Sequence, residues 1–157
     1  MKGKWILLAI CIAIPLVLVG GGSALLTRES MALFETINQP PLSPPGWLFP
    51  VVWTILYTLM GIASYKYITA MPPMTTAPKG LIFYLAQLGF NFFWSIWFFN
   101  LQAYGFAFVW LVVLWGLILA TMIQFYRVSK PAAYLLIPYF LWVTFAGYLN
   151  LAIALIN

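Results

Sequence analysis

Three tryptophans inside long apolar segments are the side chains best suited to hold a ligand: Trp53, Trp94 and Trp142. Each lies near proline, serine, asparagine or small residues of its own segment, so an indole, a small gap and a polar atom recur together. Indole faces stack on flat apolar molecules, and indole N–H groups donate to carbonyl or carboxylate oxygens. This combination predicts a cavity for a planar apolar ligand with a few acceptor groups. Core packing is the alternative for any one of these indoles.

A stripe of polar and aromatic residues surrounds Asn91. Its members recur at three- and four-residue spacing and therefore share one helix face: Tyr84, Gln87, Asn91, Trp94 with Ser95, and Phe98. Similar stripes are formed by Pro50, Trp53 or Thr54, Tyr57 and Gly61, and by Tyr139, Trp142, Ala146 and Asn150. An amide in so apolar a segment needs a hydrogen-bonding partner. Asn91 is therefore either a link between neighbouring helices or part of a ligand cavity, and both interpretations stay open.

The composition excludes most catalytic and metal chemistry. The chain has no histidine, its only carboxylates are Glu29 and Glu35, and its single cysteine is Cys11. A His-containing triad, a zinc site built from histidine and carboxylate, a carboxylate dyad, an internal disulfide and an iron–sulfur cluster are all excluded. We expect no metal site and no bound cofactor.

The chain is too apolar for a soluble fold. Of its 157 residues, 65% are hydrophobic and 6% are charged, where a soluble domain has about 45–50% apolar and about 25% charged residues. The apolar excess must face lipid, which predicts an integral membrane protein surrounded by a bilayer. The net charge of +5 does not indicate a nucleic-acid partner, because the basic residues are scattered at the ends of the apolar segments.

Five apolar segments are long enough to cross a bilayer as helices. The expected fold is an all-α membrane protein, a five-transmembrane-helix bundle in a single domain over 1–157, with spans at about 5–26, 47–68, 81–101, 106–126 and 132–156. One long polar loop, 27–45, joins the first two spans. A secretory signal peptide is the competing interpretation of the first segment, but its apolar stretch exceeds a normal signal-peptide core.

The basic residues predict how the chain is oriented. With the N-terminus inside, six basic residues lie on the inner side, namely Lys2, Lys4, Lys66, Lys79, Arg127 and Lys130, and Arg28 alone lies outside. This bias predicts an inner N-terminus and an outer C-terminus, with the 27–45 loop on the outer face.

Three motifs in a fixed order resemble a known family. The first is Pro44-Pro45-Gly46 followed by Trp53, at the start of the second span. The others are Asn91-x-x-Trp94-Ser95-x-x-Phe98-Phe99 in the third span and Pro138-Tyr139-x-x-Trp142-x-x-Phe145-Ala146-x-x-Leu149-Asn150 in the fifth. Together they resemble the TspO/MBR family, which includes tryptophan-rich sensory proteins, the translocator protein and the peripheral-type benzodiazepine receptor. The likeness extends from the first loop to the last residues.

The resemblance implies a five-helix bundle, commonly a homodimer, that binds tetrapyrroles such as protoporphyrin IX and, in some members, cholesterol or benzodiazepine-type drugs. It also implies a bacterial cell membrane as the location and a ligand cavity beneath the first loop, with segment 34–46 as its lid. Carried onto this chain, the ligand-binding residues are Trp53, Asn91, Trp94, Tyr139, Trp142 and Ala146, together with Pro44, Pro45 and Gly46. Some bacterial relatives degrade protoporphyrin IX with light and oxygen, and the implied catalytic pair is Trp53 and Trp142.

The chain departs from the family pattern in several places. Leu33-Phe34 stands where relatives often carry Trp-Tyr, and Leu42 stands where they often have an aromatic residue. Trp110 occupies a position that is often acidic in relatives. No basic residue follows Tyr148, so sterol binding through the cholesterol-recognition pattern is not supported.

Three functions follow from these residues and the resemblance. The favoured one is a membrane-embedded sensory or regulatory protein that binds a tetrapyrrole. The alternative is an enzyme that degrades protoporphyrin IX with light and oxygen. A porphyrin or sterol transporter is the weakest, because no span has an ionisable residue in its middle third and no internal repeat is visible. Since haem would lack a histidine ligand, the expected ligand or substrate is a metal-free porphyrin.

Overall fold

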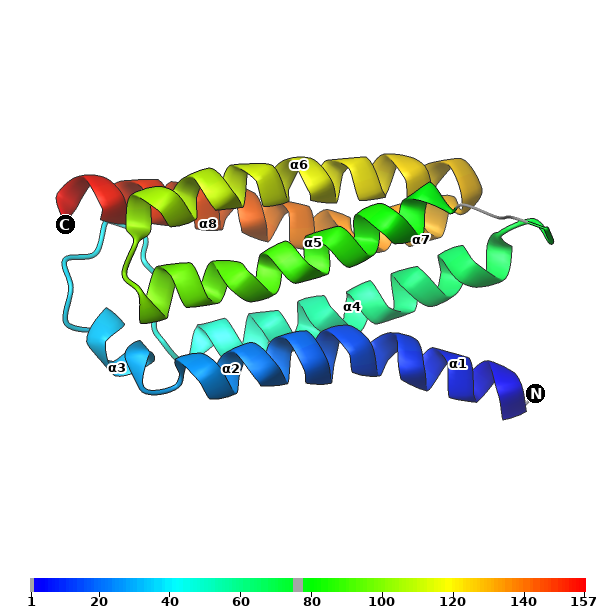
Figure 1. Ribbon diagram of the computed structural model, residues 1–157, viewed down its shortest axis with the longest axis horizontal. Coiled ribbons are helices and arrows are strands. Elements are labelled where there is room, and N and C mark those ends of the chain that lie inside the picture. Colours follow the sequence, from blue (N-terminus) through cyan, green and yellow to red (C-terminus); the bar gives the residue numbers. More distant parts are fainter. Residues whose placement is uncertain (1, 75–77) are drawn as a thin grey trace.

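Five long apolar helices make up the computed structural model, which describes residues 2–74 and 78–157. These helices are Lys2–Thr27, Leu48–Ala70, Lys79–Asn100, Tyr104–Val128 and Lys130–Ile156. They lie alongside one another, with the two termini at opposite ends of the bundle (Figure 1). The predicted five-helix membrane fold is therefore confirmed.

Three of these helices change geometry along their length. The elements in chain order are α1 (Lys2–Ala13), the π-helical segment η1 (Ile14–Gly21), α2 (Gly22–Thr27), α3 (Ser30–Phe34), α4 (Leu48–Ala70), α5 (Lys79–Ser95), the π-helical segment η2 (Ile96–Asn100), α6 (Tyr104–Val128), α7 (Lys130–Leu135) and α8 (Ile137–Ile156). Pro15 lies at the start of η1 and Pro138 at the start of α8, where the missing proline N–H is tolerated. The short helix α3 lies inside the connection that the sequence analysis described only as a polar loop.

The first two spans meet at a glycine. A Cβ atom added to Gly61 of α4 would lie 2.4 Å from Ile12 Cα and 2.8 Å from the Cys11 carbonyl oxygen. Only a residue without a side chain allows the two backbones to come this close. Gly61 therefore sets the distance between α1 and α4.

The interior of the bundle is filled by aromatic and aliphatic side chains. Tyr67 of α4 stacks on Phe125 of α6, with ring centroids 4.4 Å apart, and Met60 and Val143 are fully buried between the helices. The outer surface is apolar as well, because large side chains such as Leu18 remain 65% exposed. An apolar exterior around a packed interior is what a bilayer requires.

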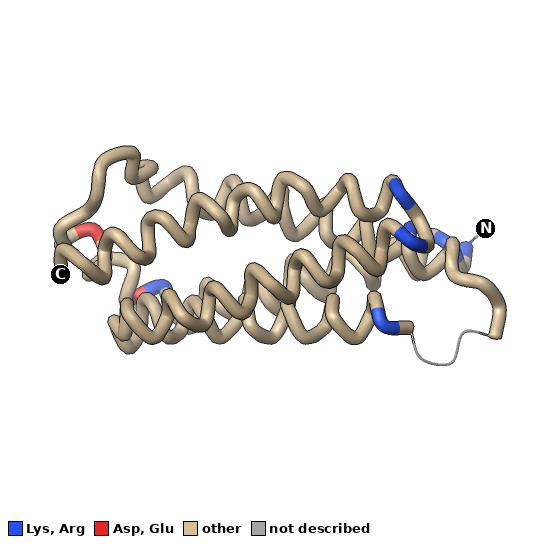
Figure 2. Tube along the Cα trace, turned by 90° about the horizontal axis from the view of Figure 1, so that it is seen from above, with Lys and Arg blue, Asp and Glu red and all other residues tan. Residues whose placement is uncertain are grey.

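Charged residues gather at the two ends of the bundle and leave its middle empty of charge (Figure 2). Six basic residues lie at the N-terminal end, whereas Arg28, Glu29 and Glu35 lie at the other. The six basic residues and Arg28 therefore lie at opposite ends of the bundle, as the predicted orientation requires. Which end faces the inside of the cell stays a prediction.

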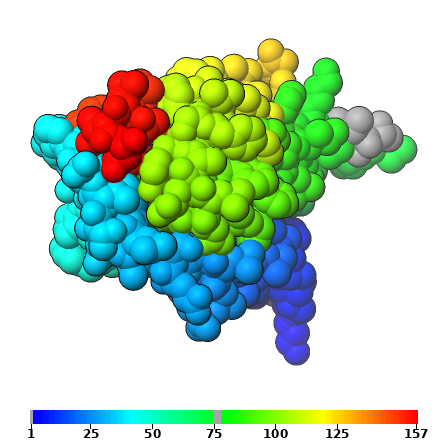
Figure 3. All heavy atoms as spheres, turned by 60° about the vertical axis from the view of Figure 1, so that its left-hand side comes forward, coloured from blue at the N-terminus to red at the C-terminus, as the bar shows by residue number. Residues whose placement is uncertain are grey.

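The 28–47 loop covers the end of the bundle that also carries the C-terminus, which we call the lid end. Figure 3 shows the loop, the last turn of α8 and the start of α6 side by side on this face. Phe34 of α3 is buried there, with ring centroids 5.7 Å from Phe98 and 5.4 Å from Phe99.

Polar contacts tie the same loop to the third span, to α8 and to the chain end. Ser30 Oγ donates to Asn100 Oδ1 at 2.6 Å, and Tyr148 Oη donates to the Pro41 carbonyl at 2.8 Å. The loop also reaches the chain end, because Asn157 Nδ2 donates to the Asn38 carbonyl at 2.8 Å. The loop is therefore held closed over the lid end by contacts distributed along its length.

Candidate functional site

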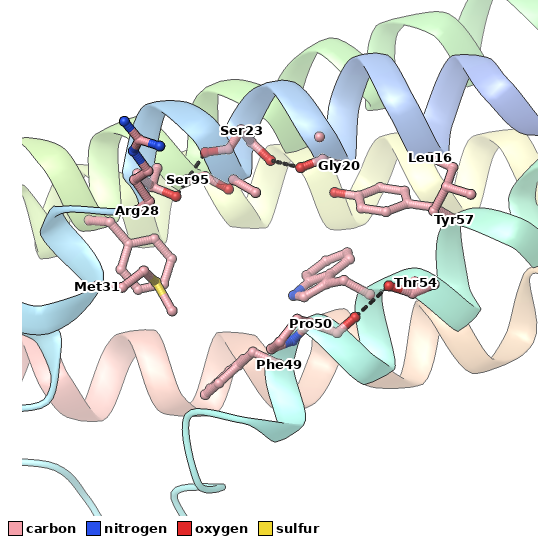
Figure 4. A pocket seen from close by; sticks show the side chains of 15 residues that line it. Leu16, Gly20, Ser23, Arg28, Met31, Phe49, Pro50, Thr54, Tyr57 and Ser95 are labelled. Carbon is pink, nitrogen blue, oxygen red and sulfur yellow. Dashed lines mark hydrogen bonds between the residues drawn. The ribbon is translucent and has the colours of Figure 1, made fainter.

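A cavity of about 550 Å³ opens between the first span, α4 and the end of the third span, directly beneath α3. Its volume lies within the range of about 300–1,000 Å³ that is typical of small-molecule sites. The wall comprises Leu16, Gly20, Gly21, Ser23, Ala24, Thr27, Arg28, Met31, Phe49, Pro50, Trp53, Thr54, Tyr57, Ser95 and Phe99. Figure 4 shows the aromatic side chains of α4 facing the small residues of the first span across this space.

Both π-helical segments border the cavity. Leu16, Gly20 and Gly21 belong to η1, and Phe99 belongs to η2. A π-helix shifts the residues that follow it around the helix axis, and such segments recur at functional sites. Gly20 is also required by close packing, since a Cβ there would lie 2.9 Å from the Tyr57 ring. The local irregularity of the first and third spans therefore shapes the cavity.

Trp53 and Tyr57 form the aromatic wall on α4. Their rings stack with centroids 5.3 Å apart and an angle of 28° between the planes. The two residues are one helical turn apart, so α4 presents both to the same side. The stacked pair forms the aromatic side of the cavity, and small residues of the first span line the same space.

A hydrogen-bonded network lies behind this wall. Tyr57 Oη donates to Asn91 Oδ1 at 2.8 Å, and Asn91 Nδ2 donates to Tyr139 Oη at 2.8 Å. Tyr139 Oη in turn donates to Gln87 Oε1 at 2.6 Å. All four side chains are buried. The network joins the second, third and fifth spans and fixes the Tyr57 ring in the cavity wall.

Most hydroxyl groups in the wall bond to their own helices. Ser23 Oγ donates to the Gly20 carbonyl at 3.2 Å, Thr27 Oγ1 to the Ser23 carbonyl at 2.8 Å, and Thr54 Oγ1 to the Pro50 carbonyl at 2.7 Å. Within residues 2–74 and 78–157, three wall side chains have donors that make no hydrogen bond: Arg28, Trp53 and Ser95. These are the groups available to a polar atom of a ligand.

Of the nine expected ligand-binding residues, Trp53 lies in the wall of this cavity. Asn91 and Tyr139 lie one layer behind it, in the network described above. Trp142 contacts the wall residue Phe49, with ring centroids 6.0 Å apart.

The remaining expected residues have other surroundings. Trp94 Nε1 donates to Asn150 Oδ1 at 3.0 Å, which links the third and fifth spans. Ala146 is half-buried and packs against the main core cluster. Pro44, Pro45 and Gly46 lie in the loop just before α4, outside the cavity wall.

The sequence analysis missed the contribution of the first span. Its small and polar wall residues, from Gly20 to Arg28, were interpreted as a possible cleavage region, as a site of close helix packing at Gly20 and Ala24, and, for Arg28, as a topology signal. Pro15 followed by three consecutive glycines, Gly20 to Gly22, was the available signal of an irregular helix. Tyr57 was visible as a member of the Trp53 stripe, although its partner Asn91 was not assigned to it.

Comparisons with known proteins agree with this architecture. Residues 11–156 match the TspO/MBR family. The chain is 39% identical over 157 residues to the tryptophan-rich protein TspO of Chlorobaculum tepidum, covering 100% of this chain and 99% of that protein. It is 34% identical over 126 residues to the protein CrtK of Rhodobacter capsulatus, covering 80% of this chain and 79% of that protein. It is 37% identical over 125 residues to the translocator protein of Bos taurus, covering 78% and 73%. The predicted resemblance is confirmed, and this chain belongs to the TspO/MBR family.

Proposed function

We propose that this protein is a membrane-embedded sensory or regulatory protein that binds a tetrapyrrole, with metal-free protoporphyrin IX as the ligand to test. The ligand occupies the cavity beneath the loop. Its apolar plane lies against the indole of Trp53, and small residues of the first span contact its other face. The observation that carries this proposal is that the stacked pair Trp53 and Tyr57 lines the same cavity as small residues of the first span such as Gly21 and Ala24.

The surrounding aromatic residues provide a second layer of the site. Phe49 separates Trp142 from the cavity, and its ring is edge-on to the Trp142 indole at an interplanar angle of 72°. A rotation of Phe49 on ligand binding would extend the cavity toward Trp142 and the fifth span. Trp142 then contacts the bound ligand, although Phe49 separates it from the cavity when no ligand is bound.

The binding test uses the intrinsic fluorescence of the indoles. Titration of protoporphyrin IX into the protein in lipid nanodiscs is expected to shift the porphyrin absorbance and to quench tryptophan fluorescence. Trp53→Ala removes the stacking surface and is expected to weaken binding about tenfold, since a lost aromatic contact with its buried area is worth about 1–2 kcal/mol. Trp5, which is 70% exposed at the opposite end, supplies the control, because Trp5→Ala is expected to leave the affinity unchanged. Equal affinities of the Trp53→Ala variant and the parent protein would refute the proposed site.

Photo-oxidative degradation of the porphyrin is the second candidate function. The observation that favours it is the cluster of oxidisable rings at the wall, where Trp53 stacks on Tyr57 and lies 6.2 Å from Tyr139 between ring centroids. The absorbance of the bound porphyrin is followed in four conditions, namely light and dark, each with and without oxygen. Protein-dependent loss of the porphyrin only in light with oxygen identifies an enzyme, and Trp53→Phe or Trp142→Phe is expected to abolish this loss. A spectral shift without loss identifies a binding protein.

Orientation, location and assembly complete the proposal. The protein lies in a bacterial cell membrane with its N-terminus inside, which places the cavity mouth and the loop on the outer side. It assembles as a homodimer, as is common in the family. Two small residues at four-residue spacing on α6, the exposed Gly116 and the half-buried Ala120, provide a surface for close packing of a second copy, since no atom lies within 4 Å of a Cβ built on Gly116. Gly116→Leu is expected to convert the dimer to a monomer in size-exclusion chromatography with light scattering.

A further inference from the structure

Arg28 is the single basic residue at the lid end of the bundle. The other six lie at the opposite end (Figure 2). Arg28 follows α2 directly and belongs to the wall of the cavity at its mouth. Neither Glu29 nor Glu35 is part of that wall. Among the residues that the structure describes, Arg28 is therefore the one charged side chain in the cavity wall.

The guanidinium of Arg28 has no partner within the part of the chain that the structure describes. It makes no ion pair and no hydrogen bond there, although two carboxylates lie at the same end. In Figure 4 the guanidinium lies at the rim and points away from Pro50 and Thr54. Because the wall hydroxyls of Ser23 and Thr27 are bonded to their own helix, Arg28 is the strongest available donor at the mouth.

The position of Arg28 suits a charge at the edge of an apolar ligand. A carboxylate drawn into the apolar part of the cavity would lose its hydration without gaining a charged partner, which is costly. A carboxylate at the rim keeps contact with water and gains a charge-assisted hydrogen bond from the guanidinium. Gly20, which faces the Tyr57 ring, lies eight residues before Arg28, so the two positions are separated by about 12 Å along the helix.

We propose that the site selects amphiphilic carboxylates, with the apolar plane of the ligand against Trp53 and its carboxylate bound at the mouth by Arg28. The inference rests on the proposed ligand cavity and adds the chemical class of its ligand. A ligand that is apolar at one end and acidic at the other fits both parts. Protoporphyrin IX has this character, because its two propionate groups lie on one edge of the ring. The neutral dimethyl ester of the same porphyrin has the same ring without the charges.

The test compares the acid and the ester on matched variants in nanodiscs of neutral lipid at low salt. Dissociation constants of protoporphyrin IX and of its dimethyl ester are measured for the parent protein, Arg28→Gln, Arg28→Lys and the control Arg127→Gln at the opposite end. The quantity of interest is the ratio of the ester constant to the acid constant. Comparing this ratio between variants cancels the different solubilities of the two compounds in the lipid.

Arg28→Gln is expected to lower the ratio about fivefold, which is the upper range for a single partly exposed charge pair. Arg28→Lys is expected to keep most of it, and Arg127→Gln all of it. Added salt is expected to reduce the ratio in the parent protein but not in Arg28→Gln, because salt screens exposed charges. If both compounds bind and Arg28→Gln leaves the ratio within twofold of the parent value, the carboxylate inference is wrong and the proposed cavity stands. If neither compound binds the parent protein, the proposed function itself fails.

Discussion

Replacing Asn91 by leucine tests whether the amide behind the cavity wall is structural. Leucine has the same number of heavy side-chain atoms as asparagine and the same branch at Cγ, so the change removes the hydrogen bonds and leaves no empty space. Tyr57 Oη loses the acceptor that it reaches at 2.8 Å, and Tyr139 Oη loses the donor that reaches it at 2.8 Å. Tyr57 is only 4% exposed, so water does not replace the lost acceptor.

The size of the effect follows from the two lost contacts. Interhelical hydrogen bonds in membrane proteins contribute about 0.6 kcal/mol on average, and a buried donor without an acceptor costs about 1–3 kcal/mol. The Tyr139 hydroxyl still donates to Gln87 at 2.6 Å, so its loss is the smaller of the two. We therefore expect Asn91→Leu to lower the free energy of unfolding by about 1.5–3 kcal/mol.

Unfolding in mixed micelles with increasing sodium dodecyl sulfate, followed by circular dichroism, measures this change. The partner variant Tyr57→Phe removes the same hydroxyl from the other side of the bond. The double variant is expected to lose less unfolding free energy than the sum of the losses in Asn91→Leu and Tyr57→Phe, because both substitutions break the same hydrogen bond. Protoporphyrin affinity is measured on the folded fraction of each variant. If Asn91→Leu keeps the parent stability but loses porphyrin affinity several-fold, Asn91 contacts the ligand directly and the structural interpretation is refuted.

Further predictions concern packing, orientation and the loop. Gly61→Ala is expected to destabilise the fold by about 1–3 kcal/mol through overpacking, measured by the same unfolding assay, whereas Gly89→Ala, which meets no atom within 4 Å, is expected to be neutral or stabilising. Leu42 and Met74 are 80% and 93% exposed. In a Cys11→Ala background on intact cells, an impermeant maleimide is expected to label Leu42→Cys and not Met74→Cys. Labelling of Met74→Cys and not Leu42→Cys would overturn the predicted orientation. Tyr148→Phe removes the bond to the Pro41 carbonyl and is expected to speed amide hydrogen exchange in the loop up to about tenfold, while unchanged exchange would show that this bond does not hold the loop.

The spans could be predicted from the sequence because a bilayer imposes a length and a polarity on each helix. The connection between the third and fourth spans is only three residues long in the structure, from Leu101 to Ala103, and the sequence analysis placed it at 102–105. Local irregularity was harder to predict. The π-helical geometry of Ile14–Gly21 begins at Pro15, which removes one backbone donor. Apolar length alone predicts that a helix crosses the bilayer and does not reveal such a local change of geometry.

The candidate site was predictable only as far as one helix determines it. The Trp53 stripe on α4 was recognisable because spacing along a helix decides which residues share a face. The partner of each face depends on how the helices are arranged. The amide of Asn91 meets Tyr57 and Tyr139 from two other spans, and the cavity lies opposite them, between α4 and the first span. Helical spacing identified these residues correctly as buried and polar and did not distinguish the cavity wall from the layer behind it.

Several of the tryptophans have a structural role that is separate from ligand binding. In a bilayer an indole N–H finds no water, so each deep indole requires an acceptor from the protein. Three indoles bond across helix contacts: Trp94 to Asn150 Oδ1, Trp110 to the Phe90 carbonyl and Trp115 to Thr144 Oγ1, at 3.0, 2.8 and 2.9 Å. Trp97 Nε1 is buried without such an acceptor, and its ring packs nearly perpendicular to that of Trp110. Trp53 differs from all of these, because it lies in a cavity wall and its N–H has no partner among the described residues. Trp53 combines this unbonded N–H with a place in the cavity wall, and it is therefore the indole to expect in contact with a ligand.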